Sequence, residues 1–353
     1  MPFASGYFKT TYRSDLSLVE TRTRWVLVVL LMAGLVVIPF FASPFLLDLA
    51  SQVYLAFIGA VALMLLTGFA GQISLGHAGF IAAGAYVTAI LFKEWNAPVW
   101  VTLPVSGAVG AILGIIFGLP SLRLKGVYLA LSTLAMHFIV TYLGSEYETV
   151  RGFATGIVIK PPSIGSFKIR DPRLWYFILL SFAVFALLLS INLLRSRSGR
   201  AWVAIRDREV VAEAIGVNVP FYKLSAFVIG AVMTSVSGCL FAYYRGFVSV
   251  EAFSLFLTVQ YVAMIIVGGL GTILGAVFGT VFVVLLPYTI DALGKMLHVP
   301  ARFTTYMFAI QYAAFGLIMI IFLVLEPGGL VAVWNRIRNY FILWPFKHKP
   351  LGR

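Results

Sequence analysis

Residues 67–80 read TGFAGQISLGHAGF and interrupt an apolar sequence with four glycines and with the polar side chains of Gln72, Ser74 and His77. Glycines destabilise a continuous helix, and irregular backbone at membrane depth is tolerated only inside protein or beside a wet cavity. We therefore expect either a broken segment that lines a solute pathway or a cytoplasmic turn whose glycines let helices pack closely. The candidate pathway residues here are Gln72, Ser74, Gly76, His77 and Gly79.

The composition on either side of this stretch is that of a membrane protein. The chain has 353 residues, of which 61% are hydrophobic and 11% charged, and its mean hydropathy is +0.98. Soluble domains are about half apolar and about a quarter charged. This composition excludes an ordinary soluble enzyme, a disordered chain and, with Cys239 as the single cysteine, a disulfide scaffold. The fold class that it predicts is an all-α polytopic membrane protein.

The apolar runs predict about ten transmembrane helices, because a bilayer core needs roughly 20 residues per helix. We expect a tail at 1–24, an uncleaved first span, a membrane region at 25–325 and a basic tail at 326–353. The ten runs are 25–43, 48–66, 79–92, 98–118, 124–144, 173–194, 221–243, 257–270, 273–290 and 304–325.

The basic residues predict the orientation of these spans. The formal net charge is +13, and cytoplasmic loops are enriched in Lys and Arg. With both termini cytoplasmic, 17 of the 26 basic residues fall on the inner side, and residues 145–172 form a long outer loop. The basic residues lie between apolar runs rather than on a solvated face, so the partner is a lipid bilayer and not a nucleic acid.

The sequence contains no energy source of its own. No acidic residue lies in the middle of a span, which disfavours an ion-coupled secondary carrier without eliminating it. Walker A, HExxH and CxxC motifs are absent, and the four histidines are scattered, so we expect no ATP site and no metal site in this chain. No paired carboxylates occur within the spans, and we expect no enzymatic activity.

Residues 195–220 form the longest polar interruption between spans. Within it, 199–216 has the pattern of an amphipathic helix, with Ala201, Ile205, Val211 and Ile215 on the apolar side and acidic residues mixed with arginines. Such a helix either lies on the lipid surface or docks into a groove of a soluble partner. The mixed charges favour the partner, because binding to anionic lipid favours unmixed basic residues.

Polar residues and glycine ladders within the spans have a structural and a functional interpretation. Ser132, Thr133 and Gln260 either face the pathway or hydrogen-bond within the helix bundle. The ladders Gly110-xxx-Gly114-xxx-Gly118 and Gly271-xxx-Gly275-xxx-Gly279 are typical of close helix packing.

Five motifs together resemble the LivM-type permease family of branched-chain amino-acid ABC transporters. They are GFAGQISLGHAGFIAAGAY (68–86), LRLKGVYLALSTLA (122–135), SGRAWVAIRDREVVAEAIGVNV (198–219), IIVGGLGTILGAVFG (265–279) and EPGGLVAVW (326–334). The order is that of the family, and the resemblance covers roughly residues 45–335.

The resemblance implies a permease subunit in the bacterial inner membrane that transports leucine, isoleucine or valine. It implies a LivH-like second permease, two cytoplasmic ATPases that bind the ATP and a periplasmic binding protein. The 199–216 segment matches the coupling helix that docks into an ATPase, and the residues carried over to that role are Arg200, Arg206, Asp207, Glu213 and Gly216.

One loop departs from the family pattern. Residues 151–157 read RGFATGI, where Arg151 and Phe153 are unusual. Because this loop lies on the outer side that faces the binding protein, urea or another small polar solute stays open as the cargo.

Overall fold

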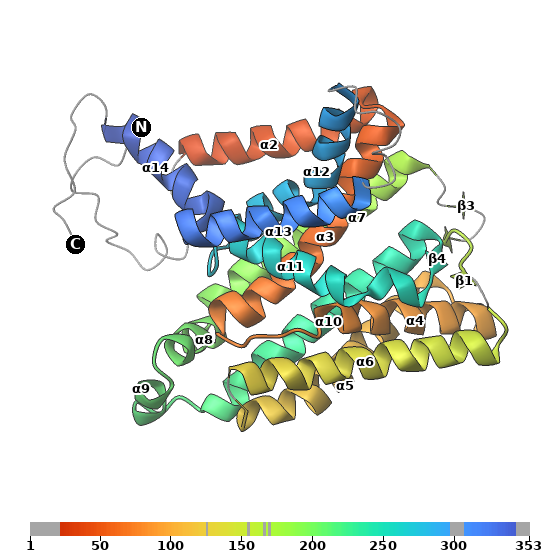
Figure 1. Ribbon diagram of the computed structural model, residues 1–353, viewed down its shortest axis with the longest axis horizontal. Helices are drawn as coiled ribbons and strands as arrows, with labels where there is room; N and C mark the ends of the chain where they lie inside the picture. The colour runs from red at the N-terminus through yellow and green to blue at the C-terminus, as the bar shows by residue number, and fades with distance from the viewer. Residues whose placement is uncertain are drawn as a thin grey trace.

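The chain folds into helices joined mostly by short connections (Figure 1). The computed structural model describes residues 22–124, 126–153, 156–164, 167–168, 171–296 and 307–343, and the remaining parts of the expected tails and of the 297–306 connection lie outside the described residues. The α-helices are α2 (Arg22–Phe41), α3 (Pro44–Leu63), α4 (His77–Trp95), α5 (Val99–Gly118), α6 (Val127–Val150), α7 (Pro172–Arg195), α8 (Arg197–Asp207), α9 (Glu209–Ala214), α10 (Val219–Arg245), α11 (Leu255–Gly268), α12 (Ile273–Met296), α13 (Met307–Leu325) and α14 (Gly329–Leu343). The short helical turns are η1 (Met64–Phe69), η2 (Leu119–Leu122) and η3 (Val250–Phe253).

The expected outer loop contains short strands. β1 (Ile157–Val158) pairs antiparallel with β4 (Phe247–Val248), with Ile157 opposite Val248. β2 (Ser163–Ile164) pairs with β3 (Phe167–Lys168). The β1–β4 pair ties this loop to the C-terminal end of α10, and the all-α class predicted for the body of the molecule is confirmed.

Seven helices of the described residues are long and apolar enough to cross a membrane, so the chain is a multi-pass membrane protein. They are Pro44–Phe69, Val99–Leu122, Val127–Val150, Pro172–Arg195, Val219–Arg245, Val250–Gly268 and Ile273–Leu293. The other three expected spans correspond to α2, α4 and α13. The apolar parts of α2 and α13 are shorter, Trp25–Phe41 and Tyr312–Phe322.

Helix α4 falls outside these seven because it is bounded by polar residues, although it lies at the centre of the molecule. It begins at His77, and Lys93 and Glu94 lie near its end. Most of its residues are buried by α5, α6 and α10. A helix surrounded by protein has little contact with lipid, so high hydropathy along its whole length is not required.

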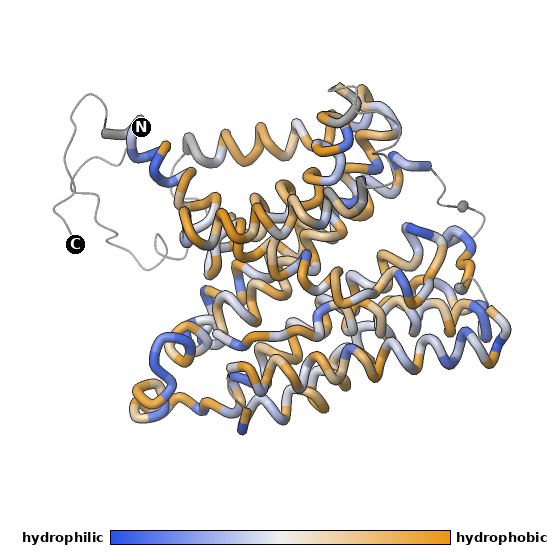
Figure 2. The backbone as a smooth tube through the Cα atoms, viewed as in Figure 1, coloured by the Kyte–Doolittle hydropathy of each residue, from blue (hydrophilic) through white to orange (hydrophobic). Residues whose placement is uncertain are grey.

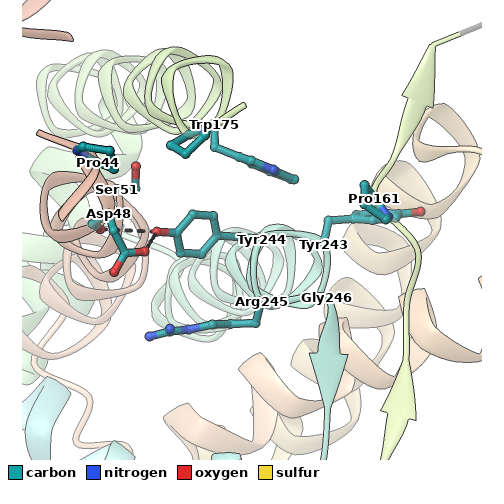
Figure 3. Close-up of a pocket in the computed structure, with 10 residues that line it drawn as sticks. Pro44, Asp48, Ser51, Pro161, Trp175, Tyr243, Tyr244, Arg245 and Gly246 are labelled. Atoms are coloured by element: carbon teal, nitrogen blue, oxygen red, sulfur yellow. Dashed lines mark hydrogen bonds between the residues drawn. The ribbon is translucent and has the colours of Figure 1, made fainter. Parts of the chain in front are cut away.

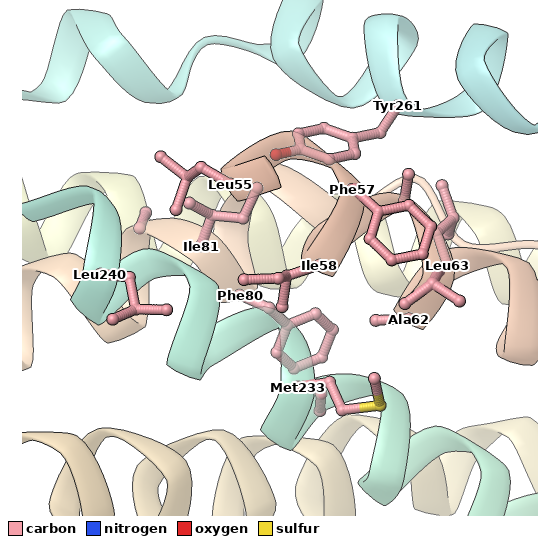
Figure 4. Close-up of a cluster of buried hydrophobic side chains, with 14 of the residues drawn as sticks. Leu55, Phe57, Ile58, Ala62, Leu63, Phe80, Ile81, Met233, Leu240 and Tyr261 are labelled. Atoms are coloured by element: carbon pink, nitrogen blue, oxygen red, sulfur yellow. The ribbon is translucent and has the colours of Figure 1, made fainter. Parts of the chain in front are cut away.

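The core forms where α3, α4, α10 and α11 meet. Figure 4 shows the apolar side chains of this region interdigitating between the helices. Its members include Phe57, Ile58, Phe80, Met233 and Tyr261. Figure 2 shows mostly hydrophobic helix bodies, with a run of hydrophilic residues where α8 meets α9.

The glycines of the first ladder pack α5 against α10, as their spacing predicted. Gly110 and Gly114 of α5 lie against Ala231 and Ser235 of α10. In the second ladder Gly275 and Gly279 pack α12 against α11, whereas Gly271 lies in the connection before α12 and has a φ of +75°. The small residues bring the helix axes close together.

Candidate functional site

The 67–80 stretch is a break between two helices. Helix α3 ends at Leu63 and continues as the π-helical turn η1 to Phe69. The chain then turns at Gly71, whose φ of +69° is a backbone conformation that glycine adopts at little cost. Residues 72–76 contain no helix, and α4 begins at His77.

Three hydrogen bonds fasten this broken segment to three different helices. The Gln72 side-chain nitrogen donates to the carbonyl of Lys223 at the start of α10 (2.9 Å). The backbone nitrogen of Leu75 donates to Thr133 Oγ1 of α6 (2.9 Å). The backbone nitrogen of Ala78 donates to Thr258 Oγ1 of α11 (3.0 Å). Backbone groups that lack helical partners are thereby satisfied inside the protein.

The polar side chains of the segment are enclosed by protein. Gln72, Ser74 and His77 are only 2–4% exposed. This burial fits the broken-segment hypothesis and not a solvent-exposed turn. Whether these residues contact a transported solute stays a prediction.

Three buried polar atoms near this segment have no hydrogen-bond partner among the residues that the structure describes. They are Gln72 Oε1, His77 Nε2 and His137 Nδ1. The His77 ring packs against the Tyr261 ring of α11, with 4.6 Å between the ring centroids. Unsatisfied buried polar atoms are rare in proteins and require an explanation.

The predicted glycines lie where α6 crosses the start of α4. A Cβ on Gly76 would overlap the Thr133 carbonyl oxygen, and a Cβ on Gly79 would lie 2.8 Å from His137 Cα. Gly76 and Gly79 therefore allow close packing, which is the structural part of the turn hypothesis. Thr133 lies beside these predicted pathway residues, because it is buried and its hydroxyl accepts a hydrogen bond from the Leu75 backbone nitrogen.

Two predicted pathway residues do not lie at the broken segment. Ser132 is only half-buried on the neighbouring side of α6. Gln260 lines a separate cavity of about 170 Å³ between α11, α12 and α13, beside Phe256 and Tyr312. The sequence reasoning missed Thr258 and Tyr261, whose spacing of three residues places them on one face of α11.

The prediction of one continuous helix over residues 199–216 is wrong. The segment consists of α8 and α9, separated by Arg208 in an extended conformation (φ −154°, ψ 95°). The apolar pattern contains the reason: Ile205 and Val211 are six residues apart, which places them on different faces of a helix. Ile205 is buried, whereas Val211 is exposed.

Helix α8 is anchored and α9 presents an apolar surface. Trp202 is buried, and its indole nitrogen donates to the Tyr222 carbonyl (3.0 Å). On α9 and the residue after it, Val210, Val211 and Ile215 are 76%, 56% and 72% exposed. We call these three residues the α9 apolar patch.

Arg206 points into the molecule rather than away from it. Its Nη1 donates to the Gly68 carbonyl in η1 (2.7 Å), and its Nε and Nη2 donate to Asp207 Oδ1. A Cβ on Gly71 would lie 2.8 Å from Arg206 Cγ, and one on Gly271 would lie 3.0 Å from Nη1. Arg206 thus joins α8 to the broken segment and to the α11–α12 connection.

The other predicted coupling residues lie at the surface of α8 and α9. Arg200 donates to the Arg195 carbonyl (2.8 Å). Glu213 is exposed, and Gly216 follows α9 with a φ of +87°, which explains why a glycine ends this helix. A partly buried ion pair between Lys223 and Glu209 (2.8 Å) fastens the start of α9 to α10.

Residues 45–324 match the family model described as the permease component of branched-chain amino acid transport systems. The high-affinity branched-chain amino acid transport system permease protein LivM of Salmonella typhimurium is 32% identical over 270 residues, which cover 70% of this chain and 64% of that protein. The LivM protein of Escherichia coli is 31% identical with the same coverage, and the probable LivM of Methanocaldococcus jannaschii is 26% identical over 226 residues, 63% of this chain and 65% of that protein. The match therefore spans slightly less than two thirds of these relatives' length, and no solved structure matches.

Proposed function

Because the chain belongs to the permease-component family of branched-chain amino acid transport systems, we propose that it is the LivM-type permease subunit of an ABC importer for leucine, isoleucine and valine. The observation that carries this proposal is the family match over residues 45–324. The names of the relatives from Salmonella typhimurium and Escherichia coli, which are branched-chain amino acid permeases, support this cargo.

The proposed topology has ten spans in the bacterial inner membrane and both termini in the cytoplasm. Helices α8, α9 and α14, which belong to segments expected on the inner side, lie toward the same end of the bundle in Figure 1. Gly68 and Gly271 both approach Arg206, and a Cβ on Gly269 would lie 2.7 Å from the Gly328 carbonyl oxygen. Helix α4 crosses the membrane inside the protein, and α2 and α13 are the remaining two spans.

The proposed energy source is ATP bound by two separate cytoplasmic ATPase subunits, with no cofactor in this chain. The α8–α9 segment is the coupling element, and the α9 apolar patch is the surface that docks. Movement of α8 is transmitted through Arg206 to Gly68 and so to the broken segment. Nucleotide binding then shifts the population between outward-open and inward-open states.

The proposed solute pathway follows the broken segment. The unpartnered atoms Gln72 Oε1, His77 Nε2 and His137 Nδ1 supply donors and acceptors to the polar end of a passing solute when the helices separate. Ser74 and Thr133 lie beside them. A LivH-like permease forms the other half of the channel, and a periplasmic binding protein delivers the solute.

Complementation in cells tests the cargo. A bacterial strain that lacks its own branched-chain amino acid importers receives this chain with the partner genes that adjoin it on its chromosome. We expect uptake of labelled leucine, isoleucine and valine to be restored, and uptake of labelled urea to be unchanged. Restoration of urea uptake without leucine uptake would overturn the assignment of the cargo.

A further inference from the structure

A cavity of about 530 Å³ opens between the ends of α3, α7 and α10 (Figure 3). Its walls include Asp48, Ser51, Trp175, Tyr243, Tyr244 and Arg245. Arg245 is the last residue of α10, whose 27 residues extend about 40 Å at 1.5 Å per residue. The cavity is therefore at the end of the molecule opposite α8 and α9.

The cavity contains one negative and one positive side chain that do not pair with each other. Asp48 accepts hydrogen bonds from the neutral Gln52 side chain (2.7 Å) and from the Tyr244 hydroxyl. In the part of the chain that the structure describes, neither Asp48 nor Arg245 forms an ion pair. A carboxylate has about four acceptor positions, so Asp48 retains capacity for a cation.

Neighbouring contacts hold the two charged groups in place. The Tyr244 ring, whose hydroxyl bonds Asp48, packs edge-to-face against Trp175, with 5.7 Å between the centroids. The Arg245 guanidinium lies 5.8 Å from the centroid of the same Tyr244 ring. Figure 3 shows Asp48 and Arg245 extending on the same side of Tyr244. Both charges are thus positioned around one aromatic ring.

Two further aromatic side chains line the cavity, beside Ser51, Gly246 and three prolines. Trp175 and Tyr243 are buried, and the Tyr243 hydroxyl bonds Thr102 of α5 at 2.8 Å. With its hydroxyl already bonded, Tyr243 contributes mainly apolar ring surface. The volume is within the usual 300–1,000 Å³ of small-molecule sites, which combine apolar walls with few polar groups.

We propose that this cavity is an outer subsite for a zwitterionic α-amino acid with an aliphatic side chain. Asp48 binds the α-ammonium group, Arg245 binds the α-carboxylate, and Trp175 and Tyr243 contact the aliphatic side chain. The inference rests on the proposed function for the class of solute. It adds a binding site in the permease that is separate from the buried broken segment.

Direct binding to the assembled permease–ATPase complex without its binding protein tests the subsite. The probes are leucine, leucinamide, which lacks the carboxylate, and 4-methylpentanoate, which lacks the ammonium group; saturation-transfer NMR measures their affinity. We expect leucine to bind best. Asp48→Asn should weaken leucine binding roughly tenfold, the loss that accompanies a hydrogen bond to a charged group, and should leave leucine no better than 4-methylpentanoate. Arg245→Gln should leave leucine no better than leucinamide.

The control is Glu146→Gln, which removes an exposed carboxylate at the outer end of α6 and should not change the affinities. Basal ATPase activity and the gel-filtration profile verify the folding of each variant. Equal affinity for the three probes in the unmodified complex, or unchanged leucine binding in both Asp48→Asn and Arg245→Gln, would overturn the subsite. If leucine uptake is restored in the complementation assay but the binding data overturn the subsite, the proposed function still holds. Failure of the subsite is therefore distinguishable from failure of the proposed function.

Discussion

Single residues decide how closely the helices of this molecule approach. Gly84 of α4 lies where that helix crosses α10, and a Cβ at this position would overlap the Ser235 carbonyl oxygen. Gly107 of α5 also faces α10, but its Cβ would lie 3.5 Å from the nearest atom, Val236 Cγ2, which is an ordinary contact. The two glycines therefore form a matched pair.

We predict that Gly84→Ala destabilises the protein and that Gly107→Ala does not. Overpacking of a well-packed core costs about 1–3 kcal/mol. In detergent, thermal unfolding followed by tryptophan fluorescence should show a lower midpoint for Gly84→Ala only. Equal midpoints for the two variants would contradict the close crossing of α4 and α10.

The side chain of Arg206 points in a different direction from the one that its proposed role in coupling to the ATPase predicts. The amphipathic pattern of residues 199–216 predicts that Arg206 contacts a partner at the surface. In the structure its guanidinium instead donates a hydrogen bond to the Gly68 carbonyl of the same chain. Its side chain is 35% exposed and that of Asp207 is 60% exposed. An inward position was not predictable, because it depends on the arrival of residues 68 and 271 from distant parts of the sequence.

We predict that Arg206→Ala combined with Asp207→Ala uncouples transport from ATP hydrolysis. The loss of a hydrogen bond from a charged group, about 1.5–3 kcal/mol, should separate α8 from η1 and reduce uptake roughly tenfold or more. Uptake and ATPase activity of the reconstituted complex measure this, and the permease pair should still co-purify. Normal uptake with normal ATPase stimulation would contradict the role of Arg206.

At the scale of elements, α8 is anchored to the helix bundle, whereas α9 exposes apolar side chains. Trp202 and the Lys223–Glu209 ion pair fix the segment to α10. The α9 apolar patch is left exposed beside the charged residues Arg208 and Glu213. Exposed apolar residues surrounded by polar ones are typical of interaction surfaces.

We predict that Val211→Asp reduces retention of the ATPase subunits on the purified permease. A carboxylate in an apolar contact loses its hydration without gaining a partner. The matched control is Val150→Asp, an exposed valine at the end of α6 that is remote from α9. Retention of ATPase by affinity purification should fall for Val211→Asp and not for Val150→Asp; equal retention would contradict docking at α9.

The sequence predicted the elements better than their connections. Each of the ten apolar runs corresponds to a helix, because apolar length is a local property of the chain. The break at Arg208 could be inferred from the spacing of Ile205 and Val211, which do not share a helix face. The non-helical path of residues 72–76, in contrast, depends on partners from other helices. Likewise Thr258, Tyr261 and the Asp48–Arg245 cavity depend on segments up to about 200 residues apart that meet only in the folded protein.

At the scale of the whole molecule, the proposed orientation places α9 in the cytoplasm and the end of α6 outside. Cys239, the single cysteine of the sequence, is fully buried, so it gives little background in labelling experiments. Introduced cysteines therefore report the side of the membrane directly.

We predict that a membrane-impermeant maleimide labels Val150→Cys, but not Glu213→Cys, in intact spheroplasts. In inverted membrane vesicles the reagent should label Glu213→Cys and not Val150→Cys. Both positions are exposed, and in the proposed orientation they lie on opposite sides of the membrane. Labelling of Glu213→Cys from the outside would contradict the orientation and, with it, docking to cytoplasmic ATPases.

The most direct test of a permease that depends on separate ATPases is uptake of labelled leucine into proteoliposomes. The complete complex, supplied with its binding protein, is compared with the same complex containing ATPases that cannot hydrolyse ATP and with this chain alone under an imposed proton or sodium gradient. We expect leucine uptake only by the complete complex supplied with ATP. Leucine uptake by the isolated chain, driven by an ion gradient without ATP, would contradict this expectation.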